Sequence, residues 1–307
     1  MSAVLFSGCS VPDNGGNTPP DDLAATEWRV TAQIVLPTPA THITFVANSV
    51  APWLGQIIYI DESRAIWRTH VSRAMPSAID AGTFLDVYGL YREQAAGVFL
   101  AIDSGGFLKA FVEIDDDGNF DTIITSENLD LSVQQFCKGG DPVTGKGWLI
   151  STENELVGYS VDEITDQLLT LNYDAPSAGN VSDCFVDHNG SVLYNTDQSK
   201  TYKSLKRKEN RSIPSFVRHA TDLGEEGTIR ILGHLGKTTA LLFDEAGGSQ
   251  ISITDGLSVY GIDEAIAIAG TNLSFGSVYS DGLIILSDAE NSRLVTVSTG
   301  YINSLDQ

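Results

Sequence analysis

Basic residues are scarce in this sequence, and their scarcity excludes one class of function. The 307 residues include 18 Lys and Arg against 40 Asp and Glu, which gives a formal net charge of −22 at pH 7. A surface this acidic repels nucleic-acid phosphates, so we exclude general nucleic-acid binding. The same charge suits a soluble extracytoplasmic protein and favours hard cations such as calcium.

Long apolar runs and closely spaced histidines are missing as well. No apolar stretch reaches the length of about 18 residues that a transmembrane helix needs, so we expect none. The five histidines are scattered, without the spacing of a metal-binding or catalytic pair. Zinc chemistry and Ser-His-Asp catalysis therefore have no support in the sequence.

The first of three cysteines lies in a short motif at the N-terminus. Cys9 follows Gly8 in MSAVLFSGC, which is typical of the end of a lipoprotein signal, although Phe6 stands where such signals usually carry Leu. We expect Cys9 to be lipidated. The alternative is a disordered cytoplasmic N-terminus.

The composition after Cys9 predicts a tether and then a single domain. Residues 10–22, SVPDNGGNTPPDD, are rich in Pro, Gly and Asn and cannot bury a core. We expect a signal remnant at 1–8, a flexible tether at 9–26 and one domain at 27–307. The protein would then be extracytoplasmic, as an outer-membrane lipoprotein or in the periplasm, with no membrane contact beyond its lipid anchor.

The other two cysteines, Cys137 and Cys184, leave two alternatives open. They would form a disulfide or remain two buried thiols, and we favour the thiols slightly because free cysteine is commonly buried. No Cys-x-x-Cys pattern accompanies them, so a zinc site is not predicted.

Short β-rich runs alternate with Gly, Asp and Asn turns along the whole domain, and no long helix is predicted. Asp-Gly at 281–282 and Gly-Gly at 105–106 are examples of the turns. Repeated strand-turn units of this kind predict an all-β fold, a β-propeller of five or six four-stranded blades. The expected strands include Glu27–Leu36, His42–Asn48, Gln56–Ile60, Ala65–His70, Val98–Ile102, Phe107–Ile114, Leu283–Leu286 and Leu294–Val297. Residues 71–92 would hold one strand or two.

Three stretches carry a resemblance to a known family. They are VYGLYREQAAGVFLAIDSGGFLKAFVEIDDDGNF (87–120), SVQQFCKGGDPVTGKGWLISTENELVGYS (132–160) and DGLSVYGIDEAIAIAGTNLSFGSVYSDGLIILSDAEN (255–291). In order and spacing they resemble the β-propeller phytases, calcium-dependent phosphatases that act on inositol hexakisphosphate. The resemblance implies calcium ions held by carboxylates at the channel mouth, where they bind substrate phosphates and activate a water.

The chain departs from that family where the chemistry would occur. Gln135 replaces a ligand Glu, Thr152 replaces another, and Ser182-Asp183 replaces a Glu-Gly pair. Ser258–Tyr260 replaces a Glu-Thr-Asp run, and Glu62-Ser63 stands where the family carries phosphate-binding Lys. Losing several ligand charges should weaken calcium binding greatly.

Five carboxylates survive as candidate metal ligands. We weigh each of them equally as a turn carboxylate, while together they could hold one Ca²⁺ as a cofactor. The candidates are Asp61, Glu153, Asp197, Asp263 and Asp288.

A basic run, KTYKSLKRKENR (200–211), stands out in so acidic a chain. It would be a charged edge strand that blocks aggregation, which we favour slightly, or a site for an anion or a partner. The candidate ligand-binding residues are Lys200, Lys203, Lys206 and Arg207.

These observations predict a phytase-like propeller with a degenerate calcium and phosphate site. Its role would be accessory, binding a phosphorylated small molecule or an adjacent catalytic domain with weak or no phosphatase activity. The alternative is an active calcium-dependent phytase in which the basic run replaces the lost Lys charges. A third possibility is an interaction propeller without a small-molecule ligand, which an exposed apolar patch would favour.

Overall fold

The computed structural model describes most of the chain from residue 25 to residue 299. The described residues are 25–46, 48, 51, 54–71, 75–90, 97–114, 119–127, 130–139, 146–165, 167–186, 191–196, 203–205, 220–222, 231–235, 239–244, 247–262, 265–271 and 274–299. At 25–26, 220–251 and 277 only the backbone is described. Within these ranges there is no α-helix, and none that could cross a membrane.

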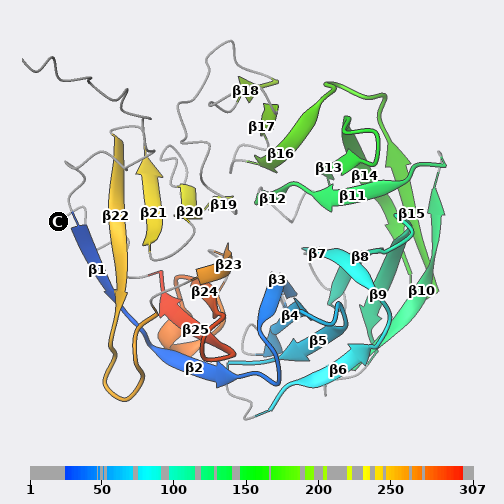
Figure 1. Cartoon of the computed structure of the whole chain (residues 1–307). Coiled ribbons are helices and arrows are strands. Elements are labelled where there is room, and N and C mark those ends of the chain that lie inside the picture. The colour runs from blue at the N-terminus through cyan, green and yellow to red at the C-terminus, as the bar shows by residue number, and fades with distance from the viewer. Residues whose placement is uncertain are drawn as a thin grey trace, which may run out of the picture.

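The described residues form 25 strands, which are arranged in six blades around a common centre (Figure 1). Blade 1 comprises β3 (Ala40–Val46), β4 (Gln56–Asp61), β5 (Ile66–Thr69) and β6 (Ser77–Asp80). Blade 2 comprises β7 (Phe84–Leu90), β8 (Val98–Asp103), β9 (Leu108–Glu113) and β10 (Phe120–Glu127). Blade 3 comprises β11 (Val133–Phe136), β13 (Lys146–Ser151), β14 (Leu156–Ile164) and β15 (Leu168–Tyr173).

The second half of the ring is completed by strands from both ends of the chain. Blade 4 comprises β12 (Lys138–Gly139), β16 (Val181–Val186), β17 (Val192–Thr196) and β18 (Lys203–Ser204). Blade 5 comprises β19 (Ala220–Asp222), β20 (Ile231–Leu235), β21 (Thr239–Asp244), β22 (Gly247–Thr254) and β1 (Ala25–Arg29). Blade 6 comprises β23 (Ala265–Thr271), β24 (Leu283–Asp288), β25 (Arg293–Ser298) and β2 (Ala32–Val35). A short 3₁₀ turn, Ser277–Tyr279, lies between β23 and β24. The β-propeller class and its blade count are thus confirmed.

The N-terminal strands close the ring, and here one prediction is wrong. The single strand expected at Glu27–Leu36 is two strands, β1 parallel to β22 and β2 antiparallel to β25. Trp28 and Val30 pack between blades 5 and 6, whereas Ile34 packs between blades 6 and 1. Apolar residues continue to alternate across the break between Arg29 and Ala32, so the sequence pattern predicts one strand. The two halves nevertheless belong to different blades.

A β-bulge recurs at the start of a strand near the centre in five of the six blades. The register shifts lie at 40/42, 84/86, 133/135, 181/183 and 265/267 in β3, β7, β11, β16 and β23. Bulges increase strand twist, which suits blades that are crowded at the centre and fan outward.

The turn between the second and third strands of a blade is tied to the next blade. In blade 1 this turn places Arg64 at φ 67°, and its carbonyl accepts the amide of Phe84 in blade 2 at 3.0 Å. Gly106 in blade 2 and Asn154 in blade 3 repeat the arrangement, with φ of 81° and 60°. Their carbonyls accept the amides that begin β11 and β16, both at 2.9 Å. Neighbouring blades are therefore linked by backbone hydrogen bonds as well as by apolar packing.

Blades 2 and 3 are joined further by a strand that changes partners. Residues Phe120–Ile123 of β10 pair antiparallel with β9, and Ile124–Glu127 pair parallel with β15. The two blades consequently form one eight-stranded sheet.

The two remaining cysteines form a disulfide between blades 3 and 4. Cys137 and Cys184 are bonded and buried, so the slight preference for free thiols is wrong. The register explains the pairing: β12 runs parallel to β16 with Lys138 opposite Phe185, which brings the preceding residues of both strands together. A separation of 47 residues carries no hint of this contact.

We expect the disulfide to contribute measurably to stability. It closes a loop of 47 residues, for which loop-closure entropy predicts about 4 kcal/mol in the free energy of unfolding. A Cys137→Ala/Cys184→Ala variant should lose most of this in chemical denaturation, and reduction of the wild type should have a similar effect. Cys9→Ala is the control. Equal stability of the oxidised and reduced wild type would contradict the prediction.

Candidate functional site

Three of the five predicted metal ligands are described, and they lie on turns of different blades. Asp61 and Asp288 end the second strands of blades 1 and 6, and Glu153 lies in the turn after the second strand of blade 3. Asp197 and Asp263 lie outside the described residues. Among the residues that are described, no group of three His, Cys, Asp or Glu side chains is placed to hold a metal ion. The calcium site remains a prediction.

Asp61 is fully engaged by its own turn and by two neighbouring side chains. Its carboxylate accepts hydrogen bonds from the Ser63 and Thr38 hydroxyls, the Ala65 amide and the Trp67 indole at 2.6–3.0 Å. Burial alone would raise the pKa of Asp61, but these four hydrogen bonds outweigh it and leave the pKa below its ordinary value. The carboxylate therefore stabilises the turn as an anion.

The same role recurs in the next two blades. Asp103 accepts the amides of Gly105 and Phe107 at 2.9 and 3.0 Å, and the Ser151 hydroxyl accepts the amide of Glu155 at 3.1 Å. An acceptor at the first turn position is thus a feature of the blade repeat. A carboxylate at this position does not by itself indicate a metal ligand.

Two positions at which the chain departs from the phytase pattern are in contact. The Gln135 amide on β11 of blade 3 donates to Asp183 Oδ1 on β16 of blade 4 at 3.1 Å. The same oxygen accepts the Cys184 amide at 2.8 Å. This pair offers one carboxylate and one amide, a weaker set of ligands for calcium than two carboxylates.

Sequence reasoning missed a polar cluster on the innermost strands of blades 1 to 4. Lys138 Nζ lies 2.5 Å from buried Asp86 Oδ1, and the Phe136 amide donates to the other oxygen at 2.8 Å. Burial would raise the pKa of Asp86, but Lys138 and His42 outweigh it and hold that pKa below its ordinary value. Burial is also the main reason that the pKa of His42 is lowered. Because Asp86 and His42 occupy equivalent bulge positions with different residue types, no sequence signal marks the cluster.

Of the candidate ligand-binding residues in the basic run, the structure describes Lys203. Lys203 lies on β18, the strand that pairs with β17 in blade 4. Lys200, Lys206, Arg207 and Cys9 lie outside the described residues.

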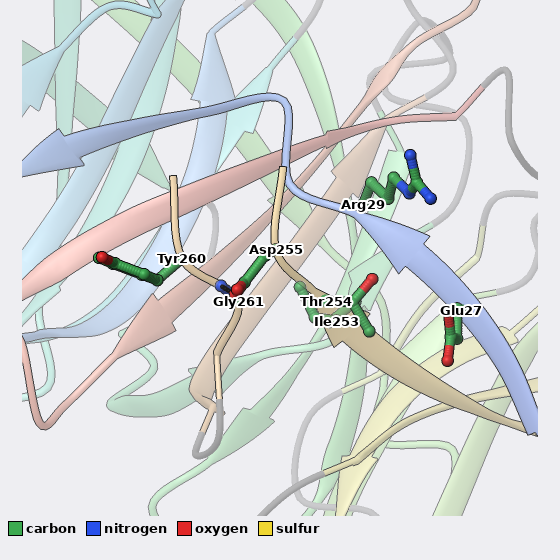
Figure 2. A pocket seen from close by; sticks show the side chains of 7 residues that line it. All are labelled: Glu27, Arg29, Ile253, Thr254, Asp255, Tyr260 and Gly261. Carbon is green, nitrogen blue, oxygen red and sulfur yellow. Dashed lines mark hydrogen bonds between the residues drawn. The ribbon is translucent and has the colours of Figure 1, made fainter. Parts of the chain in front are cut away.

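A cavity of about 640 Å³ opens where β1, β22 and the following loop meet. It is lined by Glu27, Arg29, Ile253, Thr254, Asp255, Tyr260 and Gly261. Figure 2 shows Glu27 and Arg29 extending from β1 on one side, with Asp255 and Tyr260 on the loop opposite. Glu27 and Arg29 are exposed, and neither makes a hydrogen bond or ion pair with another described residue.

The loop Asp255–Gly261, which we term the site loop, is held in one conformation. Asp255 Oδ1 accepts the Gly261 amide at 2.7 Å, and the Gly256 amide donates to the Val259 carbonyl at 2.8 Å. A Cβ atom at Gly261 would lie 2.3 Å from the Ile253 carbonyl oxygen, so the close approach requires glycine. The loop is therefore rigid without regular secondary structure.

A buried arginine fastens the site loop to blade 6. Arg293 donates to the carbonyls of Tyr260 at 3.1 Å and Gly261 at 2.6 Å, and to Gln33 Oε1 at 2.8 Å. Its Nε lies 2.7 Å from Asp288 Oδ2, and both side chains are buried. Asp288, predicted as a metal ligand, is the counter-ion of this arginine.

The site loop turns large apolar side chains toward solvent. Leu257 is fully exposed and Tyr260 is 79% exposed. Val35, also exposed, pairs with Arg293 in the neighbouring strands. Exposed apolar side chains on a rigid loop beside a charged cavity are typical of a surface that binds another molecule.

Comparison with solved structures supports the fold and nothing finer. No family model matches this sequence, and no curated protein matches it. Raptor from Chaetomium thermophilum is similar with a TM-score of 0.53 and 8% identity over 88% of this chain, which spans only 29% of the Raptor chain. A chain of the mitotic checkpoint complex is similar with a TM-score of 0.53 and 8% identity, and the match covers 97% of this chain and 98% of that one. YCF48 from Cyanidioschyzon merolae has a TM-score of 0.49 and 8% identity, and the match covers 87% of this chain and 98% of the YCF48 chain. The likeness to phytases stays a prediction.

The Arg293–Asp288 pair should be essential to the stability of the site. Replacing Arg293 with Met leaves the Asp288 charge buried, and breaking such a pair costs about 3–5 kcal/mol. The measurement is the free energy of unfolding by urea, and an Asp288→Asn/Arg293→Met variant should recover part of the loss. As the matched control, Lys109→Met removes a partly exposed pair with a long N–O distance of 3.9 Å and should cost less than about 1 kcal/mol. Equal losses for Arg293→Met and Lys109→Met would refute the assignment.

Proposed function

We propose that this protein is a binding propeller that recognises a segment of a partner protein through the site loop and the adjoining cavity, with weak or no phosphatase activity. The observation that carries the proposal is the rigid loop that exposes Leu257 and Tyr260 beside Arg29 and Glu27. The β-propeller fold is consistent with such a binding or scaffold role, and one structural neighbour belongs to a protein assembly, the mitotic checkpoint complex.

Preorganisation gives this loop its value as a binding surface. The side-chain cap from Asp255 and the two carbonyl contacts from Arg293 fix the loop before any partner arrives. A rigid surface loses little conformational entropy on binding, so more of the interaction energy remains as affinity. Tyrosine and arginine are also, with tryptophan, the residues enriched among those that dominate binding energy.

Charge indicates the chemistry of the partner segment. The cavity contains the carboxylates of Glu27 and Asp255 and a single guanidinium, in a protein with a net charge of −22. Long-range attraction therefore favours a basic segment. We propose a partner that places an apolar side chain on Tyr260 and Leu257 and a Lys or Arg beside the two carboxylates.

The engagement of the predicted ligands supports weak or absent phosphatase activity. Asp61 accepts four hydrogen bonds from within blade 1 and the segment that leads into it, and Asp288 is paired with Arg293. Binding calcium through either would require these interactions to be given up. The proposal also retains three expectations from the sequence. They are a phytase-like ancestry, a residual Ca²⁺ site that includes Asp197 and Asp263, and binding of a phosphorylated molecule.

Location outside the cytoplasm belongs to the proposal too. A buried disulfide between blades supports an oxidising compartment, as in the periplasm or at the cell surface. Lipidation of Cys9 would then hold the propeller at a membrane through the intervening segment.

Peptide selection tests the binding role. A random peptide library displayed on phage and selected on the wild type should yield peptides with an apolar residue next to Lys or Arg. We expect these peptides to lose at least about tenfold in affinity for Leu257→Ser/Tyr260→Ser, because both apolar contacts are removed. Ile124→Ser, which changes another exposed apolar residue, is the matched control. Peptides that bind all three proteins equally would refute the site.

Phosphate release tests the enzymatic alternative. With inositol hexakisphosphate and millimolar calcium, we expect no more release from the wild type than from Glu153→Gln/Asp263→Asn. The physical reason is that too few free carboxylates remain to hold bridging calcium ions. Release that saturates with calcium and disappears in the variant would establish the alternative, an active phytase.

A further inference from the structure

Strand β1 ends its sheet and leaves one edge without a partner in the described part of the chain. It pairs in parallel with β22, with Arg29 opposite Thr254. The Val30 amide donates to the Thr254 carbonyl at 3.1 Å. Because alternate residues of a strand bond to opposite sides, Trp28 bonds toward β22 as Val30 does, while the backbone groups of Glu27 and Arg29 point to the open edge.

The side chains on this edge carry opposite charges two positions apart. Glu27 and Arg29 are both exposed, whereas Trp28 between them is buried in the layer between blades 5 and 6. Since side chains alternate along a strand, Glu27 and Arg29 lie on the same face. No described residue neutralises either of them.

We propose that β1 pairs antiparallel with β1 of a second copy of this chain, centred on Trp28. In this register Glu27 lies opposite Arg29 of the second copy, and Arg29 opposite its Glu27. A two-fold axis relates the halves, as closed dimers require. Two cross-strand ion pairs and the backbone bonds of the new ladder then form together.

Backbone geometry agrees with this register. Glu27 and Arg29 have their N–H and C=O groups on the open edge, so each opposed pair exchanges both hydrogen bonds of an antiparallel ladder. Trp28 meets its own copy at the centre, where a pair without hydrogen bonds is required, and its indole stays in the core. Neither copy has to rearrange.

Charge also selects this register over its neighbours. A shift of one copy by two residues keeps the hydrogen-bonding parity but sets Glu27 against Glu27, or Arg29 against Arg29. Like charges directly opposite destabilise a strand pair. The net charge of −22 opposes association of two copies at long range, so opposite charges must face each other at the contact. Salt near 0.15 M screens the long-range repulsion beyond about 8 Å.

The pairing goes beyond the proposed function, because a partner segment could bind the site loop of a monomer. The pairing recognises the β1 strand of a second copy of this chain, whereas the proposed function recognises a segment of a different protein.

Charge reversal with sedimentation velocity tests the pairing. The wild type should show a reversible dimer, and Glu27→Arg and Arg29→Glu should each weaken it by at least about tenfold, since every opposed pair becomes like-charged. The Glu27→Arg/Arg29→Glu variant should recover the dimer, and a mixture of the two single variants should form a heterodimer. Glu62→Arg, the same charge change on an exposed turn of blade 1, is the matched control.

Cysteine trapping reports the register independently of affinity. In a Cys9→Ser background, Glu27→Cys mixed with Arg29→Cys should cross-link, because Cα atoms of a hydrogen-bonded pair lie about 5.5 Å apart, within disulfide range. Glu27→Cys alone should not, since its two copies would be more than about 7 Å apart.

Three outcomes would overturn the pairing. They are a wild-type monomer up to the highest soluble concentration, a dimer equally strong in both single charge variants, and cross-linking of Glu27→Cys with itself in place of the mixture. The first would leave the β1 edge to a strand from another protein, which the peptide selection on the wild type detects separately.

Discussion

Closure of the ring by the N-terminal strands is the constraint on which the rest of the structure depends. β1 and β2 are separated by two residues, yet they complete blades 5 and 6, whose other strands come from the end of the chain. Trp28 and Ile34 seal successive interblade layers from the two sides of this junction. Both proposed binding surfaces lie at this junction, because β1 forms a wall of the cavity and carries the open edge.

Acidic turn residues in this fold serve two competing purposes. A carboxylate at the first turn position can cap its own turn, as Asp61 and Asp103 do, or it can bind a cation. The caps use the lone pairs of the carboxylate, so a capped carboxylate has little left for a metal. In an acidic repeat protein, many Asp residues at turns are therefore expected for structural reasons alone.

Features that depend on local sequence could be predicted, and features that depend on contacts between distant segments could not. Alternating and apolar runs predicted strands such as Gln56–Ile60, and Gly105-Gly106 marked a turn, because both signals are local. The Cys137–Cys184 bond and the cavity depend on which strands meet, and that is fixed by pairing between distant segments. Tyr260 was noticed in the sequence only as a departure from a metal motif, since its exposure follows from packing.

Arg293 joins closure to the proposed binding surface. It begins β25, pairs with Val35 of the closing strand β2, and holds the carbonyls of Tyr260 and Gly261 while Asp288 balances its charge. If the ring opened at β2, the arginine would lose its contact with Gln33 and the site loop its fixed support. A partner that binds only the ordered loop must consequently favour the closed ring, by the ordinary linkage between binding and folding. Binding at the loop and integrity of the propeller are then linked equilibria.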